Sequence, residues 1–145
     1  MPRVTVLMPV WNAEATLCAA LRSVARQTET DWECVVVDDG SSDRSPAIAA
    51  AAAKADPRFR LIRRDHAGIV DTLEAGLDAV RGSLVARFDA DDWMRRDRLA
   101  RQAEALDRTP SLDAIGGGVR LFPRAPLREG RRAYEAWLNG LDSPE

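Results

Sequence analysis

The sequence is short of the residues that mark several classes of protein. It has two cysteines in 145 residues, Cys18 and Cys34, and their spacing fits neither a metal site nor a disulfide framework. A reduced, cytoplasmic setting is therefore the simplest interpretation. No apolar run approaches the ~18 residues of a transmembrane helix, and the N-terminal segment MPRVTV lacks the hydrophobic region of a signal peptide.

Net charge is also nearly absent. Lysine and arginine number 21 and aspartate and glutamate number 23, so the formal net charge is -2. This balance argues against a protein that holds nucleic acid by bulk positive charge. Hydrophobic residues make up 46% and charged residues 30% of the chain, which is typical of a folded protein. The length fits one domain of about 100–200 residues, and it is small for an enzyme that must hold two substrates.

Four short apolar segments without polar alternation predict strands that are buried on both faces. These segments span residues 4–10, 34–37, 59–62 and 84–88. Apolar residues at helical spacing lie between the segments and after the last one. They are Leu17, Leu21 and Val24; Ile48; Ile69, Leu73, Leu77 and Val80; and Leu99, Ala103 and Leu106. The repeated order of strand and helix predicts an α/β fold, with a mostly parallel sheet and helices on both faces.

The ends of these elements carry further signals. Asn12 is expected to cap the first helix, and Pro46 suits the first turn of the second. After Pro110 the pattern changes: residues 112–122 predict a further strand that bends at its glycines, and residues 134–141 predict a short helix.

Polar clusters follow three of the four predicted strands. They are the segments 9–12 (PVWN), 38–43 (DDGSSD) and 89–93 (DADDW). Because ligands of parallel α/β sheets bind at the carboxyl ends of the strands, we expect the three clusters to share one rim. Up to six carboxylates would then lie in one crevice, and Mg²⁺ or Mn²⁺ would relieve their mutual repulsion. Helix capping is an equally good explanation for Asp43 and Asp92 taken singly.

Single residues of these clusters suggest more specific roles. Asp89 and Asp91 are two residues apart, so they point the same way in an extended segment, where one of them can hold a metal. Trp11 is interpreted as an exposed aromatic that stacks on a base or frames its pocket, with a core tryptophan as the alternative. His66 is interpreted as a surface turn residue. Arginines 95, 96, 98 and 101 are interpreted as a solvated helix face.

The three clusters, taken with their flanking sequence, resemble a known family. The segments VTVLMPVWNAEATLCAALRSVARQT, DWECVVVDDGSSD and FDADDW are similar, in order and spacing, to the N-terminal half of a family 2 glycosyltransferase with the Rossmann-like GT-A fold. The resemblance covers roughly residues 3–123. It implies that residues 1–123 bind the nucleotide sugar, and that residues 124–145, a loop and a short helix, start an acceptor-binding part. A length of 145 residues then corresponds to one part of a larger protein.

The resemblance also implies an activity and the residues that serve it. The activity is inverting transfer of a sugar from a nucleoside diphosphate sugar, commonly a UDP-sugar, in the synthesis of a polysaccharide or glycoconjugate. Nucleotide-sugar contacts are implied for Pro9, Val10, Trp11, Asn12, Asp38, Asp39, Asp89 and Ala90. The implied ligands of a Mg²⁺ or Mn²⁺ ion are Asp91 and Asp89. Among these, Asp39 matches the carboxylate that accepts a hydrogen bond from the base. A metal ion would neutralise charge on the diphosphate leaving group.

The sequence departs from the family pattern at some positions. Trp11 replaces the commoner Tyr, and Glu74 stands where many members carry Asn. The general base that an inverting transfer needs belongs to a later acidic motif, and Glu129, Glu135 and Asp142 match none. We therefore expect the base beyond residue 145.

The resemblance implies partners as well. They are the nucleoside diphosphate sugar and a saccharide or lipid-linked acceptor, with no nucleic acid. Relatives build surface polysaccharides, which leaves open a peripheral association with the inner face of the membrane. The apolar residues near the end are interpreted as an unfinished core or a surface for homo-oligomers; they are Trp137, Leu138 and Leu141.

Rival functions explain the sequence less well, with one exception. A response-regulator receiver needs an acidic pair after its first strand and a late lysine, but here Trp11 and Asn12 follow that strand and the lysine is Lys54. A phosphatase of the DxDx type also carries its nucleophile after the first strand, whereas the segment DADD here follows the fourth predicted strand. A dinucleotide-binding domain needs a GxGxxG motif before a helix, whereas glycines 116–118 precede a predicted strand. The remaining alternative is a non-catalytic nucleotide-binding fragment that lacks the general base.

Overall fold

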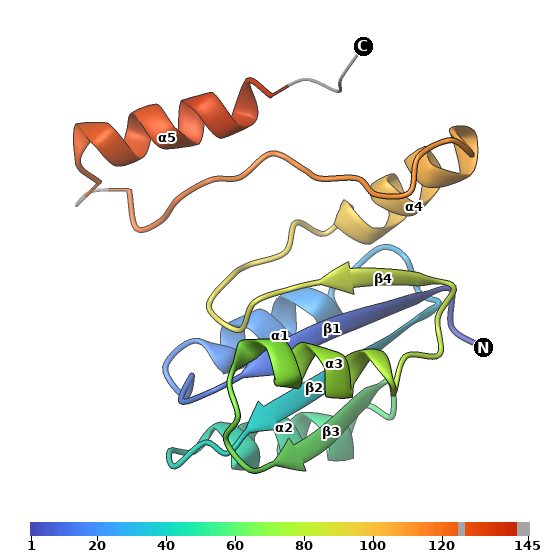
Figure 1. The fold of residues 1–145 in the computed structure, drawn as a ribbon, viewed down its shortest axis with the longest axis vertical. Coiled ribbons are helices and arrows are strands. Elements are labelled where there is room, and N and C mark those ends of the chain that lie inside the picture. Colours follow the sequence, from blue (N-terminus) through green and yellow to red (C-terminus); the bar gives the residue numbers. More distant parts are fainter. Residues whose placement is uncertain (125–126, 142–145) are drawn as a thin grey trace.

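The computed structural model of the protein describes residues 1–124 and 127–141. Its sheet consists of β1 (Val4–Val10), β2 (Trp32–Asp39), β3 (Phe59–Arg64) and β4 (Leu84–Arg87). The strand order is β3-β2-β1-β4, and all neighbouring strands are parallel (Figure 1). The helices are α1 (Leu17–Ala25), α2 (Ser45–Ala55), α3 (Ile69–Leu77), α4 (Arg98–Arg108) and α5 (Glu129–Asn139). The predicted α/β class is confirmed.

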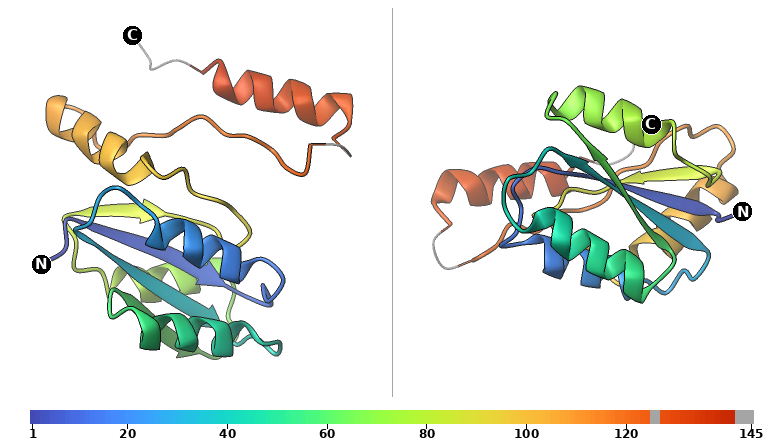
Figure 2. Two further views of the ribbon diagram at one scale, coloured as in Figure 1. Left: turned by 180° about the vertical axis from the view of Figure 1, so that it is seen from behind. Right: turned by 90° about the horizontal axis from the view of Figure 1, so that it is seen from below.

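The central strands are buried on both faces because helices cover both sides of the sheet. Every residue of β1 and β2 is buried. Val6 and Met8 belong to the larger core cluster, which includes residues of α1 and α2, whereas Leu7, Val35 and Val37 form a second cluster against α3. Figure 2 shows α1 and α2 on one side of the sheet and α3 on the other. Each fully buried Val or Leu stabilises the fold by about 1.5–3 kcal/mol, and polar residues of these strands are buried as well, among them Thr5, Glu33 and Asp38.

The third helix faces the sheet differently from the prediction. Ile69 and Leu77, two members of the predicted apolar stripe, are each 52% exposed, and α3 ends before Val80. A third member, Leu73, is partly buried against the cluster of Leu7, Val35 and Val37, as predicted, while the fully buried positions of α3 are Thr72 and Gly76. A Cβ on Gly76 would lie 2.2 Å from Cδ1 of Leu7, so this glycine allows α3 to approach the sheet closely. Close packing at a small residue has therefore outweighed the apolar spacing.

The first helix starts later than predicted. Leu17, Leu21 and Val24 are buried as expected, but the residue before α1 is Thr16, so the cap assigned to Asn12 is wrong. Asn12 has a φ of 49° and lies in the loop after β1. Its polar side chain is used there in contacts with the β2 loop, which are described below.

Helix α4 packs its predicted apolar face into the main core. Leu99 and Ala103 are 2% exposed. The side chain of Gln27 joins the segment to α1: its Oε1 accepts the backbone N–H of Leu99 at 3.1 Å, and its Nε2 donates to the carbonyl of Arg95 at 2.6 Å. The segment that follows β4 is thus fixed by both apolar and polar contacts.

The chain after α4 leaves the sheet. The strand predicted over residues 112–122 is wrong, because this segment pairs with no strand in the part of the chain that the structure describes. Helix α5 starts earlier than predicted, buries none of its described residues and lies beyond α4, apart from the sheet (Figures 1 and 2). Glu135 on α5 accepts the backbone N–H of Leu121 at 2.6 Å, which ties the helix to the extended segment. The division of the chain at residues 123 and 124 stays a prediction, and Asp142 lies outside the described residues.

Among residues 1–124 and 127–141, no helix combines the length and the apolar character needed to cross a membrane.

Candidate functional site

A cavity of about 380 Å³ opens at the carboxyl edge of the sheet, next to the ends of β1 and β4. Its walls come from the loop after β1, the start of α3 and the segment after β4. The lining residues are Pro9, Trp11, Asn12, Ala13, Thr16, Ile69, Arg87, Asp89, Ala90 and Asp91. Because β1, β2 and β4 are parallel, their carboxyl ends lie at one edge of the sheet, as the sequence predicted.

The loops after β1 and β2 are joined by a small set of hydrogen bonds around Asn12. The backbone N–H of Asn12 donates to Oγ of Ser41 at 2.9 Å, and its Oδ1 accepts the backbone N–H of Ser42 at 2.9 Å. Asp43 accepts from the backbone N–H of Glu14 through Oδ2 and of Ser45 through Oδ1. Asp43 therefore orders the loop and the start of α2, in agreement with the capping explanation, and it does not line the cavity.

Trp11 lies exposed at the rim of the cavity. Its side chain is 57% exposed, so the alternative of a core tryptophan is wrong. The indole stacks on the imidazole of His66, with the ring centroids 4.7 Å apart and the planes 20° apart. His66 is therefore more than a surface turn residue, because it supports an aromatic wall of the site.

His66 also contacts Asp39, which lies at the end of β2. Nδ1 of His66 is 2.8 Å from Oδ2 of Asp39. The same carboxylate accepts the backbone N–H of Ala67 at 3.1 Å and of Gly68 at 2.9 Å, at the start of α3. Burial raises the pKa of the Asp39 carboxyl, but hydrogen bonds from Ala67, Gly68 and Thr72 and the charge of His66 together lower the pKa below its usual value. Asp39 is thus held ionised.

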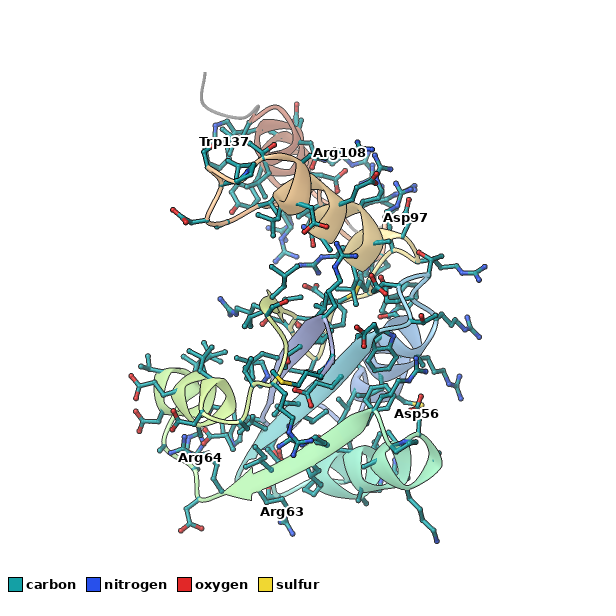
Figure 3. The ribbon with its side chains drawn as sticks, turned by 90° about the vertical axis from the view of Figure 1, so that its right-hand side faces the viewer. Asp56, Arg63, Arg64, Asp97, Arg108 and Trp137 are labelled. Carbon is teal, nitrogen blue, oxygen red and sulfur yellow. The ribbon has the colours of Figure 1, made fainter. Side chains whose placement is uncertain are left out.

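Asp38 precedes Asp39 and is also buried, but its carboxylate lacks the hydrogen bonds that Asp39 receives. It is 1% exposed, and within the residues that the structure describes neither carboxylate oxygen has a hydrogen-bond partner. The nearest cation is Arg63, whose Nε lies 3.6 Å from Oδ2 of Asp38. Arg64 lies toward α3, with Nε 3.5 Å from Oδ1 of Asp39 (Figure 3). Both arginines at the end of β3 are therefore engaged with carboxylates.

The acidic segment after β4 has one carboxyl set apart from the others. Asp89 and Asp91 line the cavity, and Asp92 does not. Burial, with the nearby charges of Asp91 and Asp89, raises the pKa of Asp92, although Arg98 opposes the effect. The raised pKa thus reflects burial first and the neighbouring negative charge second.

Two arginines offset that charge from different positions. Nη2 of Arg87 lies 3.3 Å from Oδ1 of Asp89. Arg98 is half-buried rather than solvated: its guanidinium lies 5.8 Å from the centroid of the Phe88 ring and donates to the carbonyl of Arg87 at 3.3 Å. Burial lowers the pKa of Arg98, against the raising effect of Asp92 and Asp89. Arg98 is fixed beneath the acidic segment, and Arg87 faces the cavity.

The donor set at the cavity fits a hard divalent cation that brings further ligands with it. Among the described residues no group of three or more His, Cys, Asp or Glu side chains could hold a metal ion alone. Mg²⁺ and Mn²⁺ are commonly bound by one or two carboxylates together with waters and substrate phosphates. Asp89 and Asp91 on one open cavity match that pattern, so these two residues would hold the ion.

The structure brings together most of the residues that the sequence singled out. Pro9, Trp11, Asn12, Asp89, Ala90 and Asp91 line the cavity. Val10, Asp38 and Asp39 are buried and do not line it, and Val10 belongs to the core. The nucleotide-binding and metal-binding roles given to all these residues stay predictions.

The cavity also has wall residues that sequence reasoning missed. They are Ala13, Thr16, Ile69 and Arg87. For Arg87 there was a signal, since a charged residue interrupts the apolar run of β4. Glu74, in contrast, is exposed on α3 and does not border the cavity.

Comparison with known proteins gives a consistent family. The sequence model of glycosyl transferase family 2 matches residues 5–140. The succinoglycan biosynthesis protein ExoO of Rhizobium meliloti (strain 1021) is 37% identical over 137 residues, which cover 88% of this chain and 39% of ExoO. The uncharacterised glycosyltransferase EpsJ of Bacillus subtilis (strain 168) is 33% identical over 118 residues, which cover 81% of this chain and 34% of EpsJ.

A solved structure gives the same result. The mannosyltransferase PcManGT from Pyrobaculum calidifontis, in complex with GDP-Man and Mn²⁺, is 31% identical with a TM-score of 0.64, covering 72% of this chain and 32% of PcManGT. The chain spans about a third of the length of the curated relatives that it matches. Because the family model covers most of the sequence, the chain belongs to glycosyl transferase family 2.

Proposed function

We propose that this chain is the donor-binding part of a glycosyltransferase, which holds a nucleoside diphosphate sugar and a divalent cation at the cavity beside β1 and β4. The observation that carries the proposal is the single cavity that joins an exposed aromatic wall, Trp11, to two carboxylates, Asp89 and Asp91. An aromatic face suits a flat base, and two carboxylates suit a divalent cation that binds together with a diphosphate. The complex of PcManGT with GDP-Man and Mn²⁺ supports the same class of ligand.

The base is proposed to bind at the end of the cavity formed by Trp11 and the start of α3. Trp11 offers an exposed indole face, and base stacking on an aromatic ring contributes about 1–3 kcal/mol. The Asp39 carboxylate lies beside His66, the stacking partner of Trp11. Its lowered pKa keeps it an acceptor, which suits the ring N–H of a uracil or a guanine. The family resemblance implies uracil as the common base, and PcManGT was solved with a guanine nucleotide.

The diphosphate is proposed to lie between the base and the acidic segment. In an inverting transfer the acceptor hydroxyl attacks the anomeric carbon, the bond to the diphosphate breaks, and negative charge grows on that leaving group. A cation held by Asp91 and Asp89 would supply Lewis-acid stabilisation of this charge. The carboxylates themselves repel a diphosphate, so their role depends on binding the cation first or together with the donor.

The acceptor site and the general base are proposed to lie outside residues 1–123. In the described residues, Glu135 is paired with Arg124 at 2.6 Å, and Glu129 lies on α5, away from the sheet. A saccharide or lipid-linked acceptor, a role in polysaccharide synthesis, a cytoplasmic location at the inner face of the membrane, and homo-oligomers all stay predictions. The name of ExoO, a succinoglycan biosynthesis protein, supports the polysaccharide role.

Calorimetry with UDP and with GDP, each with and without Mn²⁺, tests the donor site. Wild-type protein should bind one of the two diphosphates more tightly with Mn²⁺ than without it. Asp91→Ala should remove that dependence while the melting temperature stays unchanged, since Asp91 is exposed. Asp113→Ala is the matched control, because Asp113 is exposed in the segment after α4. An unaltered Mn²⁺ dependence in Asp91→Ala would refute the metal assignment.

A second function, nucleotide binding without transfer, is favoured by one observation. Asp89 and Asp91 are the only carboxylates that line the cavity in the described part of the chain, and both are assigned to the cation. Incubation of the protein with a nucleotide sugar and Mn²⁺ distinguishes the two functions. Release of nucleoside diphosphate supports a transferase that turns over, whereas tight binding without release supports a binding module.

A further inference from the structure

We propose that Arg87 is a diphosphate-binding residue of the cavity, and that its contact with Asp89 holds the guanidinium ready until a cation occupies the acidic segment. This inference rests on the proposed function and extends it to a residue that the motifs do not include. Arg87 is the one cationic side chain among the residues that line the cavity, within the described part of the chain.

The position of Arg87 follows from the register of β4. Arg87 is paired with Leu7 of β1, and Leu7 packs on the α3 side of the sheet. Paired residues of parallel strands point to the same face, so the Arg87 side chain also points toward α3. Ile69, at the start of α3, borders the same cavity. Arg87 therefore borders one cavity together with the start of α3, where the base is proposed, and with the carboxylates that would hold the cation.

The contact with Asp89 is loose enough to be exchanged. Nη2 and Oδ1 are 3.3 Å apart, and the side chains are 60% and 46% exposed. Charge-assisted hydrogen bonds between guanidinium and carboxylate groups are usually about 2.7–2.9 Å long, and exposed ion pairs add little stability. A cation that binds Asp89 would release the guanidinium. Arginine can then hold two phosphate oxygens at once through its planar fork.

The other arginines near this edge of the sheet do not line the cavity. Arg98 donates to the carbonyl of Arg87 and to Oε1 of Gln102 at 3.1 Å. Arg63 and Arg64 contact Asp38 and Asp39. Arg87 is accordingly the guanidinium placed to offset the charge of a diphosphate beside two carboxylates.

The test compares the wild type with Arg87→Gln and Arg87→Lys, and uses Arg22→Gln as the matched control. Arg22 is exposed on α1, so this control removes the same charge away from the cavity. The ligands are the nucleoside diphosphate that the wild type binds, the corresponding nucleoside, inorganic diphosphate, and Mn²⁺ alone. Circular dichroism melts check that all variants fold.

Arg87→Gln should bind the nucleoside diphosphate with Mn²⁺ about 10- to 100-fold more weakly, which is the usual effect of losing a hydrogen bond to a charged group. Its affinity for the nucleoside should be unchanged. Mn²⁺ alone should bind at least as tightly, because the competing guanidinium is gone from Asp89. Arg87→Lys should recover part of the affinity, since lysine keeps the charge and loses the fork.

Equal loss of nucleoside and nucleoside diphosphate affinity in Arg87→Gln would overturn the proposal, because it indicates a general structural role. Unchanged affinity for the diphosphate would also overturn it, while the proposed function stands. If the wild type binds inorganic diphosphate and no nucleoside, the base pocket of the proposed function fails, and a loss in Arg87→Gln still supports the role of Arg87. If the wild type binds neither, both proposals fail.

Discussion

Asp39→Asn is the substitution that most directly tests how the end of β2 is built. The Asp39 carboxylate receives two backbone donors at the start of α3, Ala67 N–H on Oδ1 and Gly68 N–H on Oδ2, and lies 2.8 Å from Nδ1 of His66. Asparagine has the same shape but offers one acceptor oxygen and one NH₂ group. One of the two backbone donors must then face another donor.

The expected loss of stability follows from these contacts. Leaving a buried donor without its acceptor costs about 1–3 kcal/mol, and replacing a charged acceptor by a neutral one weakens the remaining bond, so the total is about 2–4 kcal/mol. For a chain of this length that corresponds to a fall in melting temperature of about 6–12 °C. The same variant should bind the nucleoside diphosphate more weakly in both the presence and the absence of Mn²⁺, because Asp39 does not touch the cation in the proposed complex.

The dependence on pH provides an independent check. The pKa of Asp39 is lowered from its ordinary value of 3.8, so its contribution to stability is present at pH values above the unfolded pKa and is lost as the pH falls through the folded pKa. The difference in melting temperature between wild type and Asp39→Asn should shrink as the pH falls below about 4. Asp65→Asn is the control, since Asp65 is exposed close to His66. Equal melting temperatures of wild type and Asp39→Asn at pH 7 would refute this account.

Two further predictions concern packing away from the cavity. Gly82→Ala should reduce the free energy of unfolding by about 1–3 kcal/mol, because a Cβ would lie 2.6 Å from the backbone nitrogen of Thr5; Gly116→Ala, with nothing within 4 Å, is the control in urea titrations, and equal midpoints would contradict the close approach. A thiol reagent should label Cys18 in the native protein but not Cys34, which is buried and whose pKa is raised by burial and by the charge of Glu33; labelling of both before unfolding would contradict that burial.

The fold could be predicted from the sequence because its strands are short, apolar and separated by helical spacing. Helix α3 shows the limit of that reasoning. Its apolar residues Ile69 and Leu77 suggested the buried face, but the face that meets the sheet is set by Gly76, which has no side chain to reveal its role. Asn12 was misread for a similar reason, since its partners Ser41 and Ser42 come from another loop.

The candidate site was predictable where a motif contains its own chemistry and not where it depends on contacts across the fold. Two carboxylates of the 89–93 segment line the cavity, as their spacing indicated. The stack of Trp11 on His66 joins residues far apart in the sequence, and nothing local to either residue indicates it. For Arg87 the signal was a charged residue within the apolar run of β4, but it did not point to the cavity, because a charged residue near the end of a strand is usually solvated.

The two ends of the cavity differ in how firmly they are held, and this difference has consequences for binding. At the base end, Asp39 is fixed by two backbone donors and His66 is stacked under Trp11, so these residues lose little conformational freedom when a base binds. At the acidic end, Arg87 and Asp89 are exposed and form a long contact, which salt screens easily. Affinity for a nucleoside should therefore change little with ionic strength. Affinity for the diphosphate should fall as salt rises, and the part of it that responds to salt should be smaller in Arg87→Gln.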